Sequence, residues 1–382
     1  MKQGWEIKKL GEVCDVVGGS TPKTSEKTYW GGEHYWISPA ELDGSKYVYA
    51  TSRTITDEGV KSAHLQMLPI GTVLLSSRAP IGKVAITKVP MYCNQGFKNL
   101  ICKNEVINEY VYWFLLNSTD YLNSLGTGAT FKEISKKVVE QIQIPVPPLP
   151  EQEKIVAELD CLSGIIEKKK QQLKEYDALT QSIFYEMFGN VNEFIPLSYY
   201  IDSLSAGKSL AGEDECPNKV LKTGAVTYDY FDGRQVKNLP LEYTPIENHK
   251  VKVKDVLISR MNTAELVGAC AYVWNIDDST YLPDRLWRAE IRDNSNPIYL
   301  WKAIITDKAK EQIRNYASGT SGSMKNISKS SFLKVQIPKV SLSEQQEFAS
   351  KIEAIEKQKE LIKQSIAETE TLFNSRMDYY FN

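Results

Sequence analysis

Few side chains in this sequence of 382 residues have the types and spacing of an active site. Residues 206–209, Ala-Gly-Lys-Ser, imitate the end of a phosphate-binding loop, but Asp202 occupies the position of that loop's first glycine. Asp284 and Glu290 weakly imitate a metal-nuclease motif, yet Arg292 replaces the expected lysine and the first half of the chain has no counterpart. Neither pattern predicts a catalytic centre.

Metal and covalent chemistry have no better support. Six cysteines form no C-x-x-C pair, and three histidines lie far apart, so neither set has the spacing of metal ligands. The sequence contains no G-x-S-x-G nucleophile elbow. Its only Pro-Pro, residues 147–148, is followed by leucine and not by the tyrosine of an adenine-methylating motif. We therefore predict a non-catalytic binding protein that holds neither a metal nor a cofactor.

Composition narrows the class of protein further. No run of about 18 apolar residues is present, and the first residues lack the apolar core of a signal peptide, so we expect a cytoplasmic protein with no membrane partner. The formal net charge of −2 argues at first against a nucleic-acid partner, because such proteins usually carry a basic surface.

The elements that must position any binding residues are present twice. Residues 126–189 match residues 319–382 without a gap, with 19 identities in 64 pairs. Upstream of these segments the similarity is weaker but the order of features is kept. Each half therefore consists of a more variable stretch of about 150 residues followed by a better-matched tail.

Both tails are predicted to be long helices. In the first, apolar residues recur at steps of three and four from Ile155 to Ile183, and the second repeats this pattern from Phe348 to Phe373. Such a heptad seam predicts a coiled coil, and each copy has one lysine in the seam, Lys169 and Lys359. Two separate amphipathic helices are the alternative. If both halves face one ligand through a two-fold relation, the helices must be antiparallel.

The variable stretches have mixed α and β patterns. Strands are expected at residues 72–76, 83–87, 141–145, 255–259, 269–274 and 334–338, with one helix-length segment per half at 107–125 and 297–316. We predict an α+β protein with two tandem mixed α/β domains, each followed by a long helix, and the helices pairing as an antiparallel coiled coil. The boundaries are 1–150 and 189–343 for the domains, and 151–188 and 344–382 for the helices.

This division changes the meaning of the net charge. Each domain carries +2 and each helical tail −3. Because phosphate binding depends on local charge, the domains rather than the whole chain are the quantity to judge. The sum conceals two mildly basic domains and two acidic helices, although a mixed solvated surface would give the same counts.

Several motifs resemble the specificity subunit of type I restriction-modification systems. They are the Gly-Thr-Gly-Ala-Thr-Phe-Lys-x-Ile-Ser loop at 126–135, the proline-rich entry to the first helix at 144–155, and the Ser-Ser-Arg-x-x-Ile-Gly-Lys-x-Ala run at 76–85. The opening residues 5–10, the segment 18–22 and the segment 94–98 also fit. The second half departs from the pattern in its loop at 319–324, lacks the double proline, and has Arg-Met-Asn at 260–262 where the first half has Ser-Arg-Ala at 77–79.

The resemblance implies two target recognition domains, each reading one half of a split, asymmetric sequence in double-stranded DNA, with the helices setting the spacing. It also implies two methyltransferase subunits as partners, docked on the helices and carrying S-adenosylmethionine, and motor-nuclease subunits that join the complex. Candidate docking features are the Glu-Gln helix starts and the acidic helix faces. The chain itself would be non-catalytic.

DNA contacts are expected from side chains suited to bases and phosphates. Arg78 and Arg260 are favoured, because each follows a strand in an equivalent place. The full set is Thr21, Lys23, Arg78, Lys83, Gln95, Lys98, Thr130 and Lys132 in the first domain and Lys222, Arg260, Asn262, Arg285, Arg288, Ser323 and Lys325 in the second. Two other classes remain open: a duplicated protein-protein adaptor with a coiled-coil dimerisation stalk, and a single-chain nuclease using Asp284 and Glu290.

Overall fold

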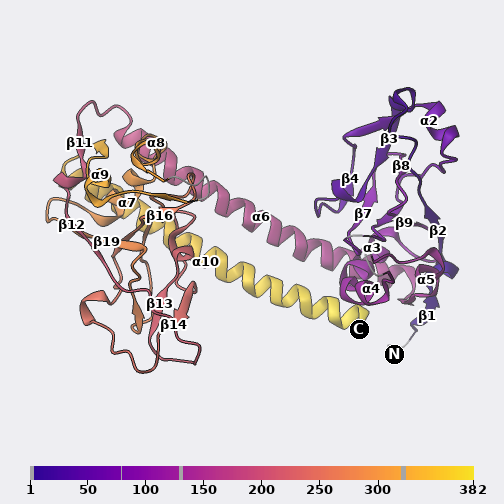
Figure 1. The fold of residues 1–382 in the computed structure, drawn as a ribbon. Coiled ribbons are helices and arrows are strands. Elements are labelled where there is room, and N and C mark those ends of the chain that lie inside the picture. Colours follow the sequence, from indigo (N-terminus) through magenta and orange to yellow (C-terminus); the bar gives the residue numbers. More distant parts are fainter. Residues whose placement is uncertain (1–3, 79, 129–131, 320–323) are drawn as a thin grey trace. The chain divides into compact units, whose positions relative to one another are not determined.

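The computed structural model describes residues 4–78, 80–128, 132–319 and 324–382 (Figure 1). The chain forms two compact units, Met1–Gln171 with Lys363–Asn382, and Gln172–Ile362. Each unit, called N-terminal or C-terminal below, thus contains one mixed domain and stretches of both long helices. The four-part functional division expected from the sequence remains a prediction.

The N-terminal domain has a five-stranded sheet in the order β2-β9-β6-β7-β4, a three-stranded sheet β5-β3-β8 and the pair β1-β10. Its core contains Leu75, Ile86 and Trp113, all buried. The elements are β1 (Glu6–Lys9), α1 (Leu10–Val13), β2 (Cys14–Gly18), β3 (Trp30–Ile37), β4 (Tyr47–Val48), β5 (Arg53–Ile55), α2 (Asp57–Ser62), β6 (Val73–Leu75), β7 (Val84–Thr87), β8 (Tyr92–Cys93), β9 (Lys98–Cys102), α3 (Asn108–Asn117), α4 (Thr119–Leu125), α5 (Lys136–Gln141) and β10 (Gln143–Val146), with short 3-10 turns at Lys27–Tyr29 and Pro39–Glu41.

The C-terminal domain repeats this plan with a four-stranded sheet β12-β19-β15-β17, a three-stranded sheet β14-β13-β18 and the pairs β11-β21 and β16-β20. The elements are β11 (Phe194–Pro196), β12 (Ile201–Ala206), β13 (Lys219–Leu221), β14 (Val236–Asn238), β15 (Val256–Ser259), β16 (Met261–Asn262), β17 (Cys270–Tyr272), β18 (Thr280–Tyr281), β19 (Leu286–Ile291), α7 (Pro297–Ile304), α8 (Asp307–Tyr316), β20 (Lys325–Asn326), α9 (Lys329–Phe332) and β21 (Gln336–Pro338), with 3-10 turns at Leu197–Tyr199, Thr223–Val226 and Glu247–His249. Both domains are therefore mixed α and β, as predicted.

The two predicted helix-length segments are each two helices. The first breaks at Ser118, between α3 and α4. The second breaks before Thr306, whose backbone is extended. The Thr306 hydroxyl caps α8 by accepting a hydrogen bond from the backbone N–H of Ala309. Apolar residues occur on both sides of each break, so periodicity alone predicts one helix where the structure has two.

The two tails form the helices α6 (Leu149–Phe188) and α10 (Leu342–Phe381), each of 40 residues (Figure 1). In the N-terminal unit, the Arg376 guanidinium binds the Glu158 carboxylate with N–O distances of 2.5 and 2.9 Å, and Lys169 Nζ lies 2.5 Å from Ser365 Oγ. In the C-terminal unit, Lys359 Nζ lies 2.7 Å from the carboxylate of Asp177. Within each unit, later residues of one helix meet earlier residues of the other, which confirms antiparallel pairing.

The starts of both helices are tied to their own domains by a glutamine. The Gln152 amide accepts the backbone N–H of Ile107 and donates to the carbonyls of Glu105 and Pro147. Gln345 makes the corresponding bonds to Asn296, Asn294 and Val340. Both glutamines are fully buried. The glutamine of the Glu-Gln motif therefore packs inside its own domain. The sequence suggested that it would dock a partner subunit, but the buried side chain is not available for that contact.

Among the described residues, no helix is both long enough and apolar enough to cross a membrane.

Candidate nucleic-acid interface

A charged group lies at the end of strand β6 in the N-terminal domain. Arg78 Nη2 lies 3.2 Å from the Glu133 carboxylate, and Lys98 Nζ lies 3.2 Å from its other oxygen. Lys98 also donates to Ser77 Oγ at 3.3 Å. Arg78 keeps 44% of its side-chain surface exposed, whereas Lys98 keeps 13%. We call Ser77, Arg78, Lys98 and Glu133 the strand-end cluster, in which one carboxylate orients two cations and leaves a net positive charge.

The backbone identifies the positions of the second domain that correspond to this cluster. Ser77 donates its N–H to Gly96, and its carbonyl accepts from Ile134, while Arg260 makes the same two bonds with Arg285 and Ile327. Arg260 is therefore the counterpart of Ser77, and Met261 is the counterpart of Arg78. The expectation that Arg78 and Arg260 occupy equivalent places is wrong by one residue, which along an extended chain turns the side chain to the opposite face.

The side chain of Arg260 also differs in its surroundings. Its Nε is buried and has no hydrogen-bond partner among the described residues. By the same register, Trp287 replaces Lys98 and Asn326 replaces Glu133. Asn262 pairs with Lys325 across β16 and β20, and Lys325 Nζ lies 3.4 Å from the Gly319 carbonyl. The three charged members of the strand-end cluster are thus replaced by the uncharged Met261, Trp287 and Asn326, whereas Arg260 stands where the first domain has Ser77.

Two chain segments cross closely beside the strand-end cluster, and two others cross beside its C-terminal counterpart. A Cβ at Gly19 would lie 2.2 Å from the Cys93 carbonyl oxygen, and a Cβ at Gly207 would lie 1.7 Å from that of Leu282. The strand register makes these glycines equivalent. The Ala-Gly-Lys-Ser segment is therefore a crossing that only glycine permits, which explains its likeness to a phosphate-binding loop without any nucleotide chemistry.

A hydroxyl group closes each crossing. Thr21 Oγ1 donates to Oε1 of Gln95, and Ser209 Oγ donates to Oδ1 of Asp284. The backbone N–H of Asp284 also donates to Ser209 Oγ at 3.1 Å. We call these two contacts the hydroxyl pairs. Thr21 and Gln95 are among the predicted DNA contacts. Ser209 and Asp284 are not among them, although aligning the two glycines identifies both residues as their counterparts.

Two other predicted contact residues have structural partners. Lys83 Nζ donates to the Leu42 carbonyl at 2.6 Å. Arg288 is buried, and its guanidinium binds the Glu290 carboxylate and the carbonyls of Asn248 and Lys250 at 3.0 to 3.1 Å. Because every part of this guanidinium is engaged inside the domain, the placement favours a structural role for Arg288.

The remaining predicted residues divide into exposed ones and undescribed ones. Lys23, Lys132, Lys222 and Arg285 are exposed. Thr130 and Ser323 lie outside the described residues. The assignment of these residues to DNA stays a prediction.

An aromatic group in the N-terminal domain was not predicted from the sequence. The Arg53 guanidinium lies 3.7 Å from the ring centre of Trp30, whose indole is edge-on to Trp36 at 5.1 Å. The indole N–H of Trp30 donates to the Lys23 carbonyl at 3.2 Å. The contact positions Arg53, at the start of β5, through a cation–π interaction that no local sequence motif predicts.

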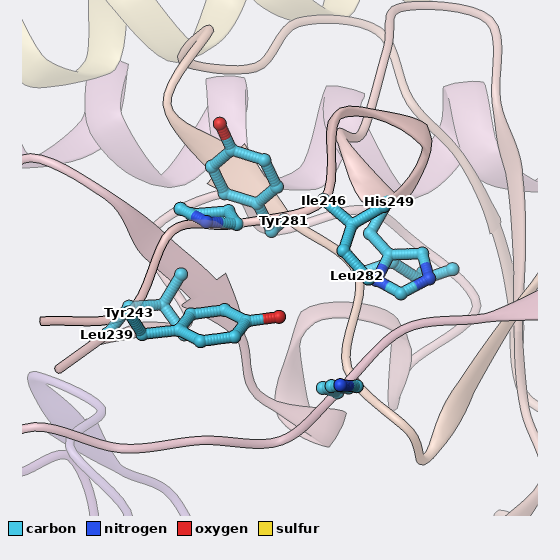
Figure 2. Close-up of a pocket in the computed structure, with 8 residues that line it drawn as sticks. Leu239, Tyr243, Ile246, His249, Tyr281 and Leu282 are labelled. Carbon is cyan, nitrogen blue, oxygen red and sulfur yellow. The ribbon is translucent and has the colours of Figure 1, made fainter.

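A small pocket lies beside the C-terminal crossing (Figure 2). Its lining includes Lys208 and Leu282 from the two crossing segments, together with Tyr281 from β18. The rest of the lining comes from the segment before β15, namely Leu239, Tyr243, Pro245, Ile246 and His249. The pocket therefore separates the crossing from that segment, and it contains no cluster of catalytic side chains.

The nuclease hypothesis gains nothing from the geometry. Asp284 is held by Ser209, while Glu290 accepts hydrogen bonds from Ser205 and Arg288. Across the described part of the chain, no group of three or more His, Cys, Asp or Glu side chains is arranged to hold a metal ion.

Comparisons with known proteins agree with the repeated plan. The family model of the type I restriction modification DNA specificity domain matches residues 2–175 and 211–371. The MjaIX type I restriction enzyme specificity subunit of Methanocaldococcus jannaschii is 40% identical over 194 residues, which cover 50% of this chain and 45% of that protein. The EcoKI specificity subunit of Escherichia coli is 21% identical over 354 residues, or 84% of this chain and 76% of that one.

Solved structures show the same fold. The S subunit of a type I restriction-modification system from M. genitalium superimposes with a TM-score of 0.61 at 13% identity, covering 99% of this chain and 96% of that one. The match to the MjaIX subunit spans less than half of that protein. Since the family model matches most of the chain, in both halves, the protein belongs to the type I restriction modification DNA specificity domain family.

Proposed function

We propose that this chain is the DNA-specificity subunit of a type I restriction-modification complex. The N-terminal domain reads one half of a bipartite, asymmetric site and the C-terminal domain reads the other, while α6 and α10 set the spacing between them. The observation that carries the proposal is the family match in both halves, combined with cationic side chains beside an equivalent crossing in each domain.

Two further parts of the proposal concern partners. Two methyltransferase subunits, which bind S-adenosylmethionine, dock on the helices, and motor-nuclease subunits join through the complex. The chain itself contributes recognition and no catalytic step. The net charge of −3 on each helical tail, against +2 on each domain, supports a role of the helices in protein docking and of the domains in phosphate binding.

The proposed base and phosphate contacts centre on the strand ends. Arg78 is the strongest candidate, because Glu133 orients its guanidinium while leaving it accessible. A guanidinium held in one plane suits the two acceptors on the major-groove edge of guanine. Lys132, Lys222 and Arg285 are exposed and suit phosphate contacts. Arg288 is set aside, since its donors are already used inside the domain.

A gel-shift series tests this function. Purified chain is mixed with the methyltransferase subunit of its system and with duplexes that contain or lack a split sequence selected from a random library. We expect preferential binding to the split sequence, steeply weakened by salt. Equal binding to selected and random duplexes would contradict the proposal and favour the adaptor alternative.

A further inference from the structure

The hydroxyl pairs hold two different side chains at one equivalent position. Counting from the strand pairing of β19 and β9, Asp284 is the counterpart of Gln95, and Ser209 is the counterpart of Thr21. Both Gln95 and Asp284 are exposed. Each sits beside the strand end that carries the proposed DNA contacts, since Gly96 and Arg285, the next residues, bond to the backbones of Ser77 and Arg260.

The geometry fixes which atoms of Asp284 remain free. Ser209 Oγ accepts the Asp284 backbone N–H and uses its own proton on Oδ1 of the same residue. The carboxylate is therefore held in one orientation with Oδ2 free to accept a hydrogen bond. At position 95, Thr21 occupies Oε1 of the amide, so the free group is the NH2, which only donates.

The position of Asp284 beside the proposed DNA contacts limits what its carboxylate can bind. Its neighbours Lys208 and Arg285 are exposed cations, yet no ion pair involves Asp284 within the described ranges. A carboxylate beside DNA is repelled by phosphates, and it lowers non-specific affinity. It is favourable there only where it accepts a hydrogen bond from the exocyclic amino group of a base.

We propose that positions 95 and 284 are equivalent base-reading positions with opposite hydrogen-bonding character. Asp284 accepts from the amino group of cytosine or adenine in the major groove of one half-site. Gln95 donates to a purine acceptor in the other half-site. This inference rests on the proposed function, because it names the bases that the two domains recognise through a shared backbone position.

Exchanging the acceptor for a donor tests the C-terminal position. The chain and its variants are combined with the methyltransferase subunit and presented with a randomised duplex library, and base preference is read position by position from adenine methylation. D284N keeps the size of the side chain but adds a donor, so the preference for an amino-bearing base at one position should fall roughly tenfold. The other half-site should be unchanged.

The matched control is D278N, which removes the same charge from an exposed carboxylate in the turn before β18. We expect no change in base preference for this control. If D284N also leaves every position unchanged, or alters binding to all sequences equally, base reading by Asp284 is wrong. If the unmodified chain shows no preferred sequence at all, the proposed function fails instead.

Two variants keep the test decisive if D284N folds poorly. S209A retains the carboxylate but removes the group that orients it, so discrimination at the same base should weaken several-fold while binding persists. Q95E converts the donor of the N-terminal domain into an acceptor and should shift its half-site toward an amino-bearing base at one position. Unchanged preferences in both variants would overturn the proposal.

Discussion

The two domains share a backbone but differ in chemistry at the strand end. In the N-terminal domain Glu133 joins Arg78 and Lys98, whereas the corresponding residues of the C-terminal domain are Asn326, Met261 and Trp287. The glycine crossing and the buried glutamine at the helix start are unchanged between them. The crossing and the helix start therefore define the shared scaffold, whereas the side chains at the strand ends differ between the domains.

The first prediction tests whether the glycine crossing is part of the shared scaffold. Gly207→Ala should destabilise the C-terminal unit by about 3 kcal/mol, because its Cβ would lie 1.7 Å from a carbonyl oxygen that cannot move without the strand. Gly19→Ala should act similarly on the N-terminal unit. Thermal unfolding measures both effects.

Gly164→Ala is the matched control for these variants. Gly164 lies in α6 with nothing within 4 Å of its added Cβ, so alanine should stabilise the helix by about 0.5–1 kcal/mol. If Gly207→Ala is as well tolerated as this control, the crossing is not the shared scaffold.

A second prediction concerns a lysine that the N-terminal domain lacks. Lys302 occupies the place of Trp113, counted from the residues that bond the helix-start glutamines. Burial lowers the pKa of Lys302 to about 8, an effect that the Glu356 carboxylate opposes and Lys359 reinforces. Between pH 8 and its unfolded pKa of 10.5, the unfolded chain binds more protons, so the free energy of unfolding should rise with pH.

Lys302→Met should abolish this rise and stabilise the C-terminal unit at pH 7 by roughly 2 kcal/mol, since no charge then needs to be buried. Denaturant unfolding at pH 7, 9 and 10.5 measures the slope. A variant with the parental slope would show that another group titrates in this range.

The third prediction contrasts Arg78 with its counterpart Met261. Arg78→Ala should reduce base discrimination roughly tenfold at one half-site only, because the lost guanidinium bonds are specific to one domain. Met261→Ala removes side-chain volume at the equivalent position and should leave discrimination intact. Competition binding with single-base variants of the site measures both, and an equal loss on all sequences would assign Arg78 to a phosphate.

The smallest expected effect comes from Glu133→Gln. Releasing Arg78 and Lys98 from a carboxylate should raise non-specific DNA affinity a few-fold and steepen its salt dependence by about one phosphate contact. Asn326→Gln at the equivalent position should change neither quantity. Binding titrations at several salt concentrations distinguish the two variants. If the salt dependence of DNA affinity is the same for both, the strand-end cluster does not contact DNA.

The sequence predicts the parts of this fold that local pattern controls. The heptad seam predicted both long helices and their pairing, because apolar periodicity encodes which face packs. The antiparallel direction came from the repeat, because two halves that face one ligand through a two-fold relation require it. The helix breaks at Ser118 and before Thr306 were missed, since a break of one or two residues leaves the apolar pattern continuous. The six predicted strands match β6, β7, β10, β15, β17 and β21 to within two residues at each end, and the other strands of the structure were not predicted.

The candidate site was less predictable, because its contacts join residues far apart in sequence. Glu133 meets Arg78 and Lys98 only after the sheet forms, and nothing in their spacing indicates it. The buried state of Arg288 follows from carbonyls 38 and 40 residues away. The one-residue offset between Arg78 and Arg260 follows from aligning Val-Leu-Leu-Ser at 73–76 with Val-Leu-Ile-Ser at 256–259, and the backbone hydrogen bonds confirm it.

Methylation of a randomised duplex library by the chain together with its methyltransferase subunit tests whether two diverged domains read two different half-sites. The structure predicts a bipartite motif with two unlike half-sites separated by a fixed number of unspecified bases. A palindromic motif, a single continuous motif, or no motif would contradict it.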